Sequence, residues 1–130
     1  MELHTGIKGH DEVAVTDANV AKALGSGALP VFSTPSLIIS MERASLESVQ
    51  PYLKEGESTV GVELNVQHLA ATPIGMTVRF ESELTQIDGR MLLFAVEAYD
   101  DTGLVGKGTH RRCIVQEERF MKKALGKLEK

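Results

Sequence analysis

The chain has 130 residues, of which 42% are hydrophobic and 25% are charged, and this composition predicts one globular domain, residues 1–130, with a real hydrophobic core. Fourteen Lys and Arg against eighteen Asp and Glu give a formal net charge of -4, which argues against a nucleic-acid partner and against attraction to an anionic membrane. The single cysteine, Cys113, excludes an intramolecular disulfide, and the four histidines show no zinc-ligand spacing, so we expect no metal.

The N-terminal residues favour a cytoplasmic location. Residues 1–6 have neither the basic start nor the apolar run of a signal peptide. No apolar stretch in the sequence approaches the ~20 residues that a membrane-spanning helix needs. We therefore expect a cytoplasmic protein without a membrane partner.

The first elements predicted along the chain are an edge strand and a short helix. Residues 7–15 mix β-branched and polar side chains, which is typical of a strand at the edge of a sheet. A helix capped by Thr16 or Asp17 is then predicted to reach Leu24, and Gly25-Ser26-Gly27 ends it in a flexible loop.

Thr34-Pro35 begins the clearest helix, because Thr is a good N-cap and Pro is favoured at the first helical position. The helix is predicted to run from about Pro35 to Gln50 and to stop at Pro51. A helical projection gathers its polar residues in one sector, formed by Ser40, Arg43, Glu47 and Gln50. Because nearly all the other positions are apolar, the helix is expected to be buried over most of its circumference.

Residues 59–68 alternate strictly between apolar and polar side chains, the clearest strand signal in the chain. The apolar face is formed by Val60, Val62, Leu64 and Val66. This face is expected to cover the helix.

Three further elements complete the chain. Strands are predicted at about 76–87 and 90–99, joined antiparallel by Asp88-Gly89, the strongest short hairpin signal. A second turn leads to a strand near 104–116, and the charged residues 117–130 are predicted to form a helical tail.

The order of these elements predicts an α+β fold, in which an antiparallel sheet of about five strands wraps around one long central helix. This is the hotdog architecture. One such unit leaves a sheet edge and the far side of the helix only partly covered, so we expect a homodimer, with further pairing into a tetramer left open.

Glu42 and His68 are the ionisable residues that this arrangement turns inward. Glu42 falls within the apolar arc of the helix, where a carboxylate without a partner costs several kcal/mol or takes up a proton. His68 continues the parity of the apolar face of residues 59–68. Each has a structural alternative, an ion pair for the carboxylate and a core hydrogen bond for the imidazole. Side by side, however, the two groups can shuttle protons near neutral pH.

Thr34, Gly61 and the last strand offer further candidates. Thr34 at the helix N-cap either satisfies a backbone N–H or assists the helix dipole in stabilising an oxyanion. Gly61 marks a bulge or the close approach of a ligand. In the last strand, Arg111 and Arg112 form either a solvated edge or a cation pair that attracts a phosphorylated cofactor tail.

Several short motifs resemble the fluoroacetyl-CoA thioesterase group of hotdog proteins from about Val31 to Val115. The residues that carry the resemblance are Val31-Phe32-Ser33-Thr34, Met41-Glu42, Pro51-Tyr52-Leu53, Gly56-Glu57, Gly61, His68, Ala70-Ala71-Thr72-Pro73, Gly75, Thr77-Val78 and Gly108-Thr109-His110. The resemblance implies that Thr34, Glu42 and His68 are catalytic and that Gly61 and Arg112 lie on the substrate side.

We therefore expect an acyl-CoA thioesterase that hydrolyses a small acyl thioester to the acid and free CoA. Glu42 would attack the carbonyl or activate a water, and CoA would enter as part of the substrate, with no separate cofactor. The alternatives are a hotdog hydratase or dehydratase on acyl-CoA and a non-catalytic acyl-CoA binding protein. Residues 25–29 replace the aromatic lid of the fluoroacetyl enzyme, and Arg43 replaces a Trp, so fluorinated specificity is not carried over.

Overall fold

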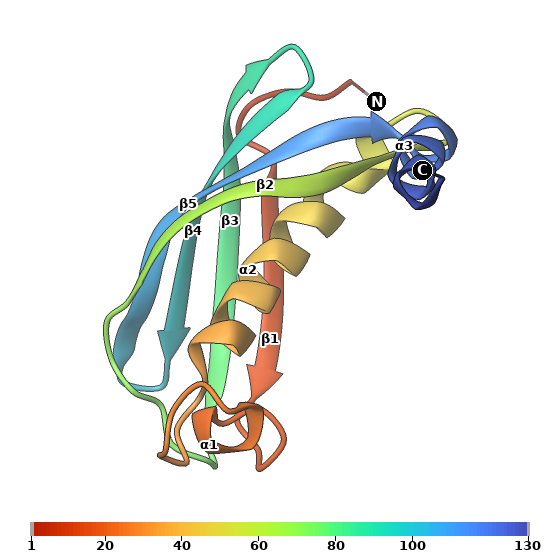
Figure 1. The fold of residues 1–130 in the computed structure, drawn as a ribbon. Coiled ribbons are helices and arrows are strands. Elements are labelled where there is room, and N and C mark those ends of the chain that lie inside the picture. Colours follow the sequence, from red (N-terminus) through yellow and green to blue (C-terminus); the bar gives the residue numbers. More distant parts are fainter. Residues whose placement is uncertain (1, 130) are drawn as a thin grey trace.

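Five antiparallel strands form one strongly curved sheet in the order β1-β3-β4-β5-β2 in the computed structural model, which describes residues 2–129 (Figure 1). The strands are β1 Lys8–Ala14, β2 Glu57–His68, β3 Thr77–Asp88, β4 Met91–Asp100 and β5 Gly103–Gln116. Each lies within two residues of its predicted place. Both predicted turns are present, and Gly89 and Gly103 take positive φ angles of 60° and 142° that favour glycine.

The long helix α2, Thr34–Val49, lies in the concave side of this sheet and packs mainly on β1 and β3 (Figure 1). Its buried face is formed by Leu37, Ser40, Met41, Ala44, Ser45 and Val49. Gly9 of β1 lies directly beneath the backbone carbonyl of Ala44, where a Cβ atom would not fit. The predicted α+β arrangement of one helix wrapped by one sheet is therefore confirmed.

Most positions of α2 are buried or half-buried, as predicted, but two residues differ from the predicted polar and apolar sectors. Ile39 is 50% exposed, whereas Ser40, which the projection placed in the polar sector, is only 2% exposed. Arg43 and Glu47 are exposed on the same side as Ile39, so the exposed strip of the helix is narrow and mostly charged. The helix ends at Val49, and Pro51 lies in the short 3-10 helix η1, Gln50–Tyr52.

A β-bulge changes which side chains of β2 face the helix. The register against β5 shifts between Gly61 and Glu63, so that Val62 has no partner and is 51% exposed. Thr59 and Gly61 therefore face inward before the bulge, and the predicted inward positions of Val60 and Val62 are wrong. Beyond the bulge the predicted parity holds, and His68 faces the side that α2 occupies.

The remaining helices lie at the two ends of the molecule. The predicted first helix is shorter than expected, with α1 formed only by Ala21–Leu24. The loop after it is closed by backbone hydrogen bonds from Lys22 to Leu29 (3.1 Å) and from Ser26 to Ala21 (3.1 Å). No helix in residues 2–129 is long and apolar enough to cross a membrane.

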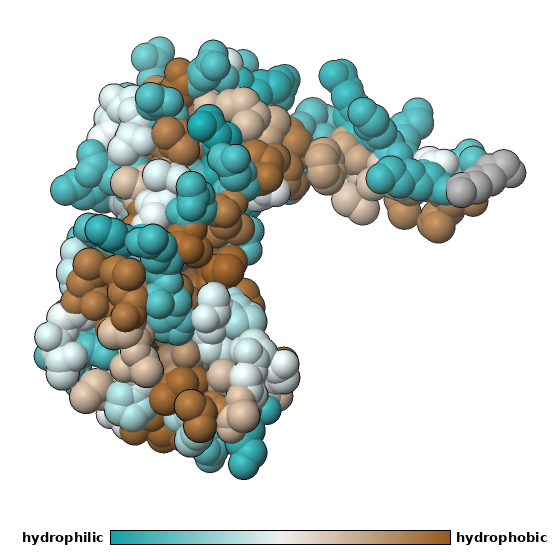
Figure 2. Space-filling view, turned by 60° about the vertical axis from the view of Figure 1, so that its left-hand side comes forward, coloured by the Kyte–Doolittle hydropathy of each residue, from teal (hydrophilic) through white to brown (hydrophobic). Residues whose placement is uncertain are grey.

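The C-terminal helices α3, Glu117–Leu125, and η2, Gly126–Leu128, confirm the predicted helical tail and project from the body as an arm (Figure 2). None of their residues is buried. Their exposed large apolar side chains are Phe120, Met121, Leu125 and Leu128. The arm therefore carries an apolar face that its own chain leaves uncovered.

Candidate active site

Ser33, rather than Thr34, caps helix α2. The Ser33 hydroxyl accepts a hydrogen bond from the backbone N–H of Ser36 (3.1 Å), and the Ser33 carbonyl accepts one from Leu37 (3.0 Å). The predicted cap is thus wrong by one residue, because Ser33 keeps extended dihedral angles and Thr34 is already helical. As a consequence, the Thr34 hydroxyl is available for another partner.

That partner is His68 at the end of β2. Thr34 Oγ1 lies 2.8 Å from His68 Nδ1, which joins the start of the helix to the far end of the strand. The other ring nitrogen, Nε2, is buried and has no hydrogen-bond partner among residues 2–129. A buried polar atom without a partner is uncommon, and in a candidate site it marks the place where a further group is expected.

A cavity of about 310 Å³ opens beside this pair. It is lined by Ala21, Ser26, Val31, Phe32, Thr34, His68, Leu69, Ala70 and Ala71. Ser26 belongs to the segment that replaces the aromatic lid of the fluoroacetyl enzyme, so this segment borders the cavity. Thr34 brings two groups to this region. Its backbone N–H has no partner within residues 2–129, and its hydroxyl hydrogen is free for a ligand when His68 carries its own hydrogen on Nδ1 and donates it to Thr34 Oγ1.

These two donors replace the larger set that the sequence predicts at the helix N-terminus. Pro35 has no N–H, and the N–H groups of Ser36 and Leu37 are taken by Ser33. An oxyanion at this place would therefore be stabilised by Thr34 alone and by the helix dipole.

His68 is held in the form that accepts a proton. Burial of the ring lowers the pKa of His68 below its ordinary 6.5, and the backbone of Ala70 opposes this change only in part. The imidazole is consequently neutral at neutral pH and suited to general acid–base work.

Glu42 belongs to a second cluster. Its Oε2 atom lies 3.7 Å from Nη1 of Arg112, and its side chain is 38% exposed while that of Arg112 is 7% exposed. Gly61 faces the same point, since a Cβ atom there would lie only 2.6 Å from Glu42 Oε2. The predicted close approach at Gly61 is therefore that of the Glu42 carboxylate, and the alternative of a bulge is also present.

Arg112 is a buried cation, which corrects the expectation of a solvated edge at this position. Its Nε donates to Thr59 Oγ1 (2.7 Å) and its Nη2 to the Thr59 carbonyl (2.9 Å). Arg111 is the exposed member of the pair, and its Nε lies 3.1 Å from Glu63 Oε1. Only Arg111 is placed to meet a charged group from solvent.

The two clusters are separate within one chain. Glu42 lies eight residues after Thr34 on α2, which corresponds to about 12 Å along the helix axis. No hydrogen bond or ion pair within residues 2–129 joins Glu42 to His68. The prediction that the carboxylate and the imidazole lie side by side is therefore wrong for the single chain.

Thr59 and His110 were given no role in the predicted site, although His110 stands in one of the motifs that carry the resemblance. His110 is fully buried next to Arg112 and Gly61. The signal that could have found it is the alternation along residues 104–116, which turns His110 and Arg112 to the same face. Residues 2–129 contain no group of three or more His, Cys, Asp or Glu side chains that could hold a metal ion.

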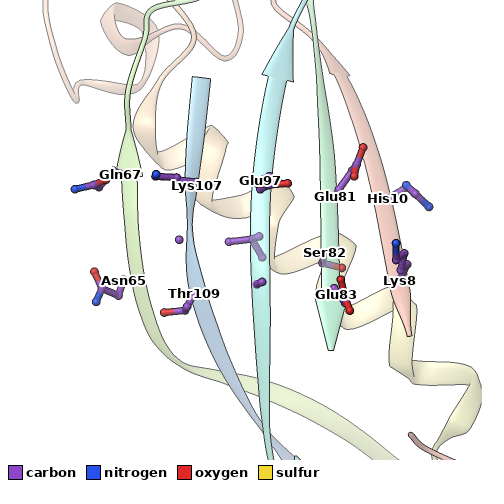
Figure 3. Close-up of a pocket in the computed structure, with 13 residues that line it drawn as sticks. Lys8, His10, Asn65, Gln67, Glu81, Ser82, Glu83, Glu97, Lys107 and Thr109 are labelled. Atoms are coloured by element: carbon purple, nitrogen blue, oxygen red, sulfur yellow. The ribbon is translucent and has the colours of Figure 1, made fainter. Parts of the chain in front are cut away.

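A larger cavity of about 420 Å³ lies on the opposite face of the sheet. Figure 3 shows that its lining residues come from all five strands and that the labelled charged and amide side chains stand on the face away from α2. One row across the strands is formed by His10, Glu81, Glu97, Lys107 and Gln67. The site residues predicted from the sequence, namely Thr34, Glu42, Gly61, His68 and Arg112, do not line this groove.

Comparison with protein-family models and with curated proteins shows similarity to one group of thioesterases. The family model described as "Fluoroacetyl-CoA-specific thioesterase" matches residues 15–118. The fluoroacetyl-CoA thioesterase of Streptantibioticus cattleyicolor is 40% identical over 90 residues, which cover 69% of this chain. The matched region spans 65% of the length of that relative.

Solved structures agree with the fold. The crystal structure of a mutant of the fluoroacetyl-CoA-specific thioesterase FlK superposes with a TM-score of 0.91 at 32% identity and covers 98% of each chain. A hot-dog-like protein from Thermanaerovibrio acidaminovorans gives a TM-score of 0.89 at 24% identity, over 97% of this chain and 93% of that one. The second likeness shows the hotdog fold.

Proposed function

The chain belongs to the family of fluoroacetyl-CoA-specific thioesterases, and from this we propose that it hydrolyses a small acyl-CoA thioester to the acid and free CoA. The observation that carries the proposal is the Thr34–His68 pair at 2.8 Å, at the start of a helix and beside a cavity of about 310 Å³. An imidazole that is neutral at neutral pH can transfer protons, and a hydroxyl and an unpartnered N–H can stabilise the oxyanion that forms in acyl transfer.

In this mechanism the thioester carbonyl oxygen lies against the hydroxyl and N–H of Thr34. Addition to the carbonyl carbon places a negative charge on that oxygen, and the two donors with the helix dipole stabilise it. The carbon–sulfur bond then breaks and CoA leaves as the thiolate. The thiolate takes up the proton released by the water that adds to the carbonyl or cleaves the anhydride, and neutral His68 accepts this proton and passes it on. Glu42 either adds directly to the carbonyl, giving an anhydride that water cleaves, or removes a proton from the attacking water.

A homodimer supports this chemistry better than a single chain. Glu42 is too far from Thr34 in its own chain, its side chain is 38% exposed, and His68 Nε2 is buried without a partner. The edge strand β2 and the exposed Ile39 offer a surface for a second copy. The proposed site takes Thr34 and His68 from one copy and Glu42 from the other, and a tetramer would repeat it.

The acyl group is set by the segment before the helix. Ser26 lines the cavity in the region where small residues replace the aromatic lid of the fluoroacetyl enzyme. Arg43 points elsewhere, because its Nη1 lies 3.4 Å from Asp11 Oδ2 on β1. We therefore assign a small acyl group without a requirement for fluorine. The reaction needs no cofactor beyond the CoA of the substrate, and a CoA substrate supports a cytoplasmic location.

Release of CoA thiol from short, branched and aromatic acyl-CoAs tests the proposal. Wild type is compared with Glu42→Gln and His68→Ala, and we expect thiol release by wild type that both variants lose. A hydratase would change the acyl chain without releasing thiol, and a binding protein would retain acyl-CoA without turnover. Either of those results would replace the thioesterase assignment.

A further inference from the structure

His110 is a buried histidine whose two ring nitrogens both have partners. Nδ1 lies 3.0 Å from the backbone carbonyl oxygen of Glu63, and Nε2 lies 3.1 Å from Nη1 of Arg112. A carbonyl oxygen only accepts hydrogen bonds and a guanidinium only donates them. The ring is therefore neutral, with its hydrogen on Nδ1 and a lone pair on Nε2 that accepts from Arg112.

The lone pair on His110 Nε2 completes the set of contacts that hold the Arg112 guanidinium in one orientation. Thr59 already accepts from Nε at 2.7 Å and from Nη2 at 2.9 Å, so His110 provides the contact for the remaining nitrogen, Nη1. The guanidinium is planar and its donors form a rigid fork, so contacts at three nitrogens fix its orientation. The nitrogen that His110 holds is also the one that lies 3.7 Å from Glu42 Oε2.

The bulge in β2 makes this geometry available. Gly61 lies opposite Arg112 and Leu64 lies opposite His110, so a two-residue step on β5 spans three residues on β2. The bulge brings the Glu63 carbonyl within hydrogen-bonding distance of His110. It also turns Gly61, which has no side chain, toward the Glu42 carboxylate. One irregularity therefore serves both the histidine and Glu42.

We propose that neutral His110 is a positioning residue, which holds the Arg112 guanidinium against Glu42 and so keeps the carboxylate in place for thioester hydrolysis. This inference rests on the proposed function. It assigns a role to a histidine that does not touch the reacting atoms and acts through Arg112. Protonation of His110 would replace the lone pair on Nε2 with a hydrogen and set two cations against each other, which would break the contact.

The surroundings of His110 favour the neutral ring. Burial, foremost, lowers the pKa of His110 below its ordinary 6.5; the Glu63 carbonyl and the Glu42 carboxylate raise it, and Arg112 lowers it further. The fourth neighbour is the Phe94 ring of β4, whose centroid lies 6.3 Å away and which adds no charge. The net shift keeps the imidazole neutral in the pH range where a thioesterase would work.

Two substitutions separate this role from simple packing. His110→Leu removes the acceptor while keeping an apolar side chain, and we expect kcat to fall about ten-fold, the loss expected for one hydrogen bond to a charged group. His110→Gln keeps an amide oxygen as acceptor and cannot titrate, so it is expected to retain most of kcat. KM should change little in both. Equal kcat values in wild type and His110→Leu would overturn the proposal.

The tautomer is measured without any substrate, by long-range ¹H–¹⁵N NMR of the histidine rings in the wild-type protein. We expect His110 to show the hydrogen on Nδ1, and a ring with its hydrogen on Nε2 would overturn the inference even if His110→Leu fails to fold. Hydrogen exchange of Arg112 Nε–H should be slow in wild type and His110→Gln. If these signals hold while no acyl-CoA is cleaved, the proposed function fails and the positioning of Arg112 by His110 stands.

Discussion

Thr34 Oγ1 lies 2.8 Å from Nδ1 of His68, although 34 residues separate the two in the chain. The contact exists because Ser33 takes over the capping of α2 and leaves the Thr34 hydroxyl unused by the helix. Thr34, which the sequence predicts as the helix cap, therefore presents its hydroxyl beside the cavity. The first prediction tests whether this hydroxyl contributes to the reaction.

Thr34→Val keeps the shape of the side chain and removes the hydroxyl. We expect kcat to fall by about 100-fold, the usual loss for one oxyanion donor, because the backbone N–H alone then faces the carbonyl oxygen. Thr34→Ser keeps the hydroxyl and should retain most of the activity. Thiol release under saturating acyl-CoA measures both, and an unchanged kcat in the valine variant would remove Thr34 from the reaction centre.

The pH dependence follows from the burial of His68. Since burial lowers its pKa below 6.5, the neutral ring persists into mildly acidic solution, and kcat/KM should fall only as the pH drops through that lowered pKa.

The same titration destabilises the fold, because the unfolded chain binds the proton near pH 6.5 and the folded chain only at lower pH. NMR titration of the His68 ring checks the prediction, which a midpoint above 6.5 would contradict.

Gly61→Ala should displace the Glu42 carboxylate. The added Cβ atom would lie 2.6 Å from Glu42 Oε2 and 3.3 Å from His110 Cε1. The end of a flexible side chain can move away, so we expect a small change in stability but a loss of kcat of about ten-fold or more. Gly126→Ala is the matched control, since it has helical dihedral angles and no atom within 4 Å of the new Cβ. Equal losses in both variants would count against the prediction.

Complementation between two inactive variants tests the shared site. In a heterodimer of Glu42→Gln and His68→Ala, one site takes both intact residues if Glu42 acts across the interface, so we expect roughly half of the wild-type activity per dimer. If each site uses residues of one chain only, the heterodimer has no intact site. Differently tagged chains are purified as heterodimers, and thiol release below a few per cent would place the whole site within one chain.

Asp100 is a buried hydrogen-bond acceptor outside the site. It is 3% exposed and accepts from Thr72 Oγ1, Thr102 N and Thr102 Oγ1, each at 2.8 Å. Burial raises the pKa of Asp100, but these hydrogen bonds outweigh it and the pKa is lowered. The carboxylate thus stabilises the fold at neutral pH, and this contribution is lost as the pH falls below the ordinary 3.8.

Asp100→Asn places an NH₂ group against hydroxyl and N–H donors. We expect the free energy of unfolding to fall by about 2 kcal/mol, with Asp101→Asn at the exposed neighbouring position as the control. Urea denaturation at neutral pH measures both variants. A loss for Asp100→Asn no larger than that for Asp101→Asn would show that the three bonds add nothing to stability.

The sequence by itself determined the elements and the face that His68 presents. Alternation along residues 59–68, the Asp88-Gly89 turn and the helix start near Thr34 are local signals, set by dihedral preferences and by the periods of strand and helix. They suffice for five strands around one helix. The parity of His68 also survives, because the extra residue of the bulge lies before it and leaves the count from Leu64 onward unchanged.

Only the tertiary structure decided which of these side chains meet. Periodicity predicts which face of the helix carries Glu42, but not which residues of the sheet lie opposite it. In the folded chain the Glu42 carboxylate lies against Arg112 and Gly61 instead of His68. The bulge that turns Gly61 inward comes from the pairing of β2 with β5. His110 is enclosed by Glu63 of β2, Phe94 of β4 and Arg112 of its own strand. Such contacts depend on the packing of segments far apart in the chain, which no local pattern encodes.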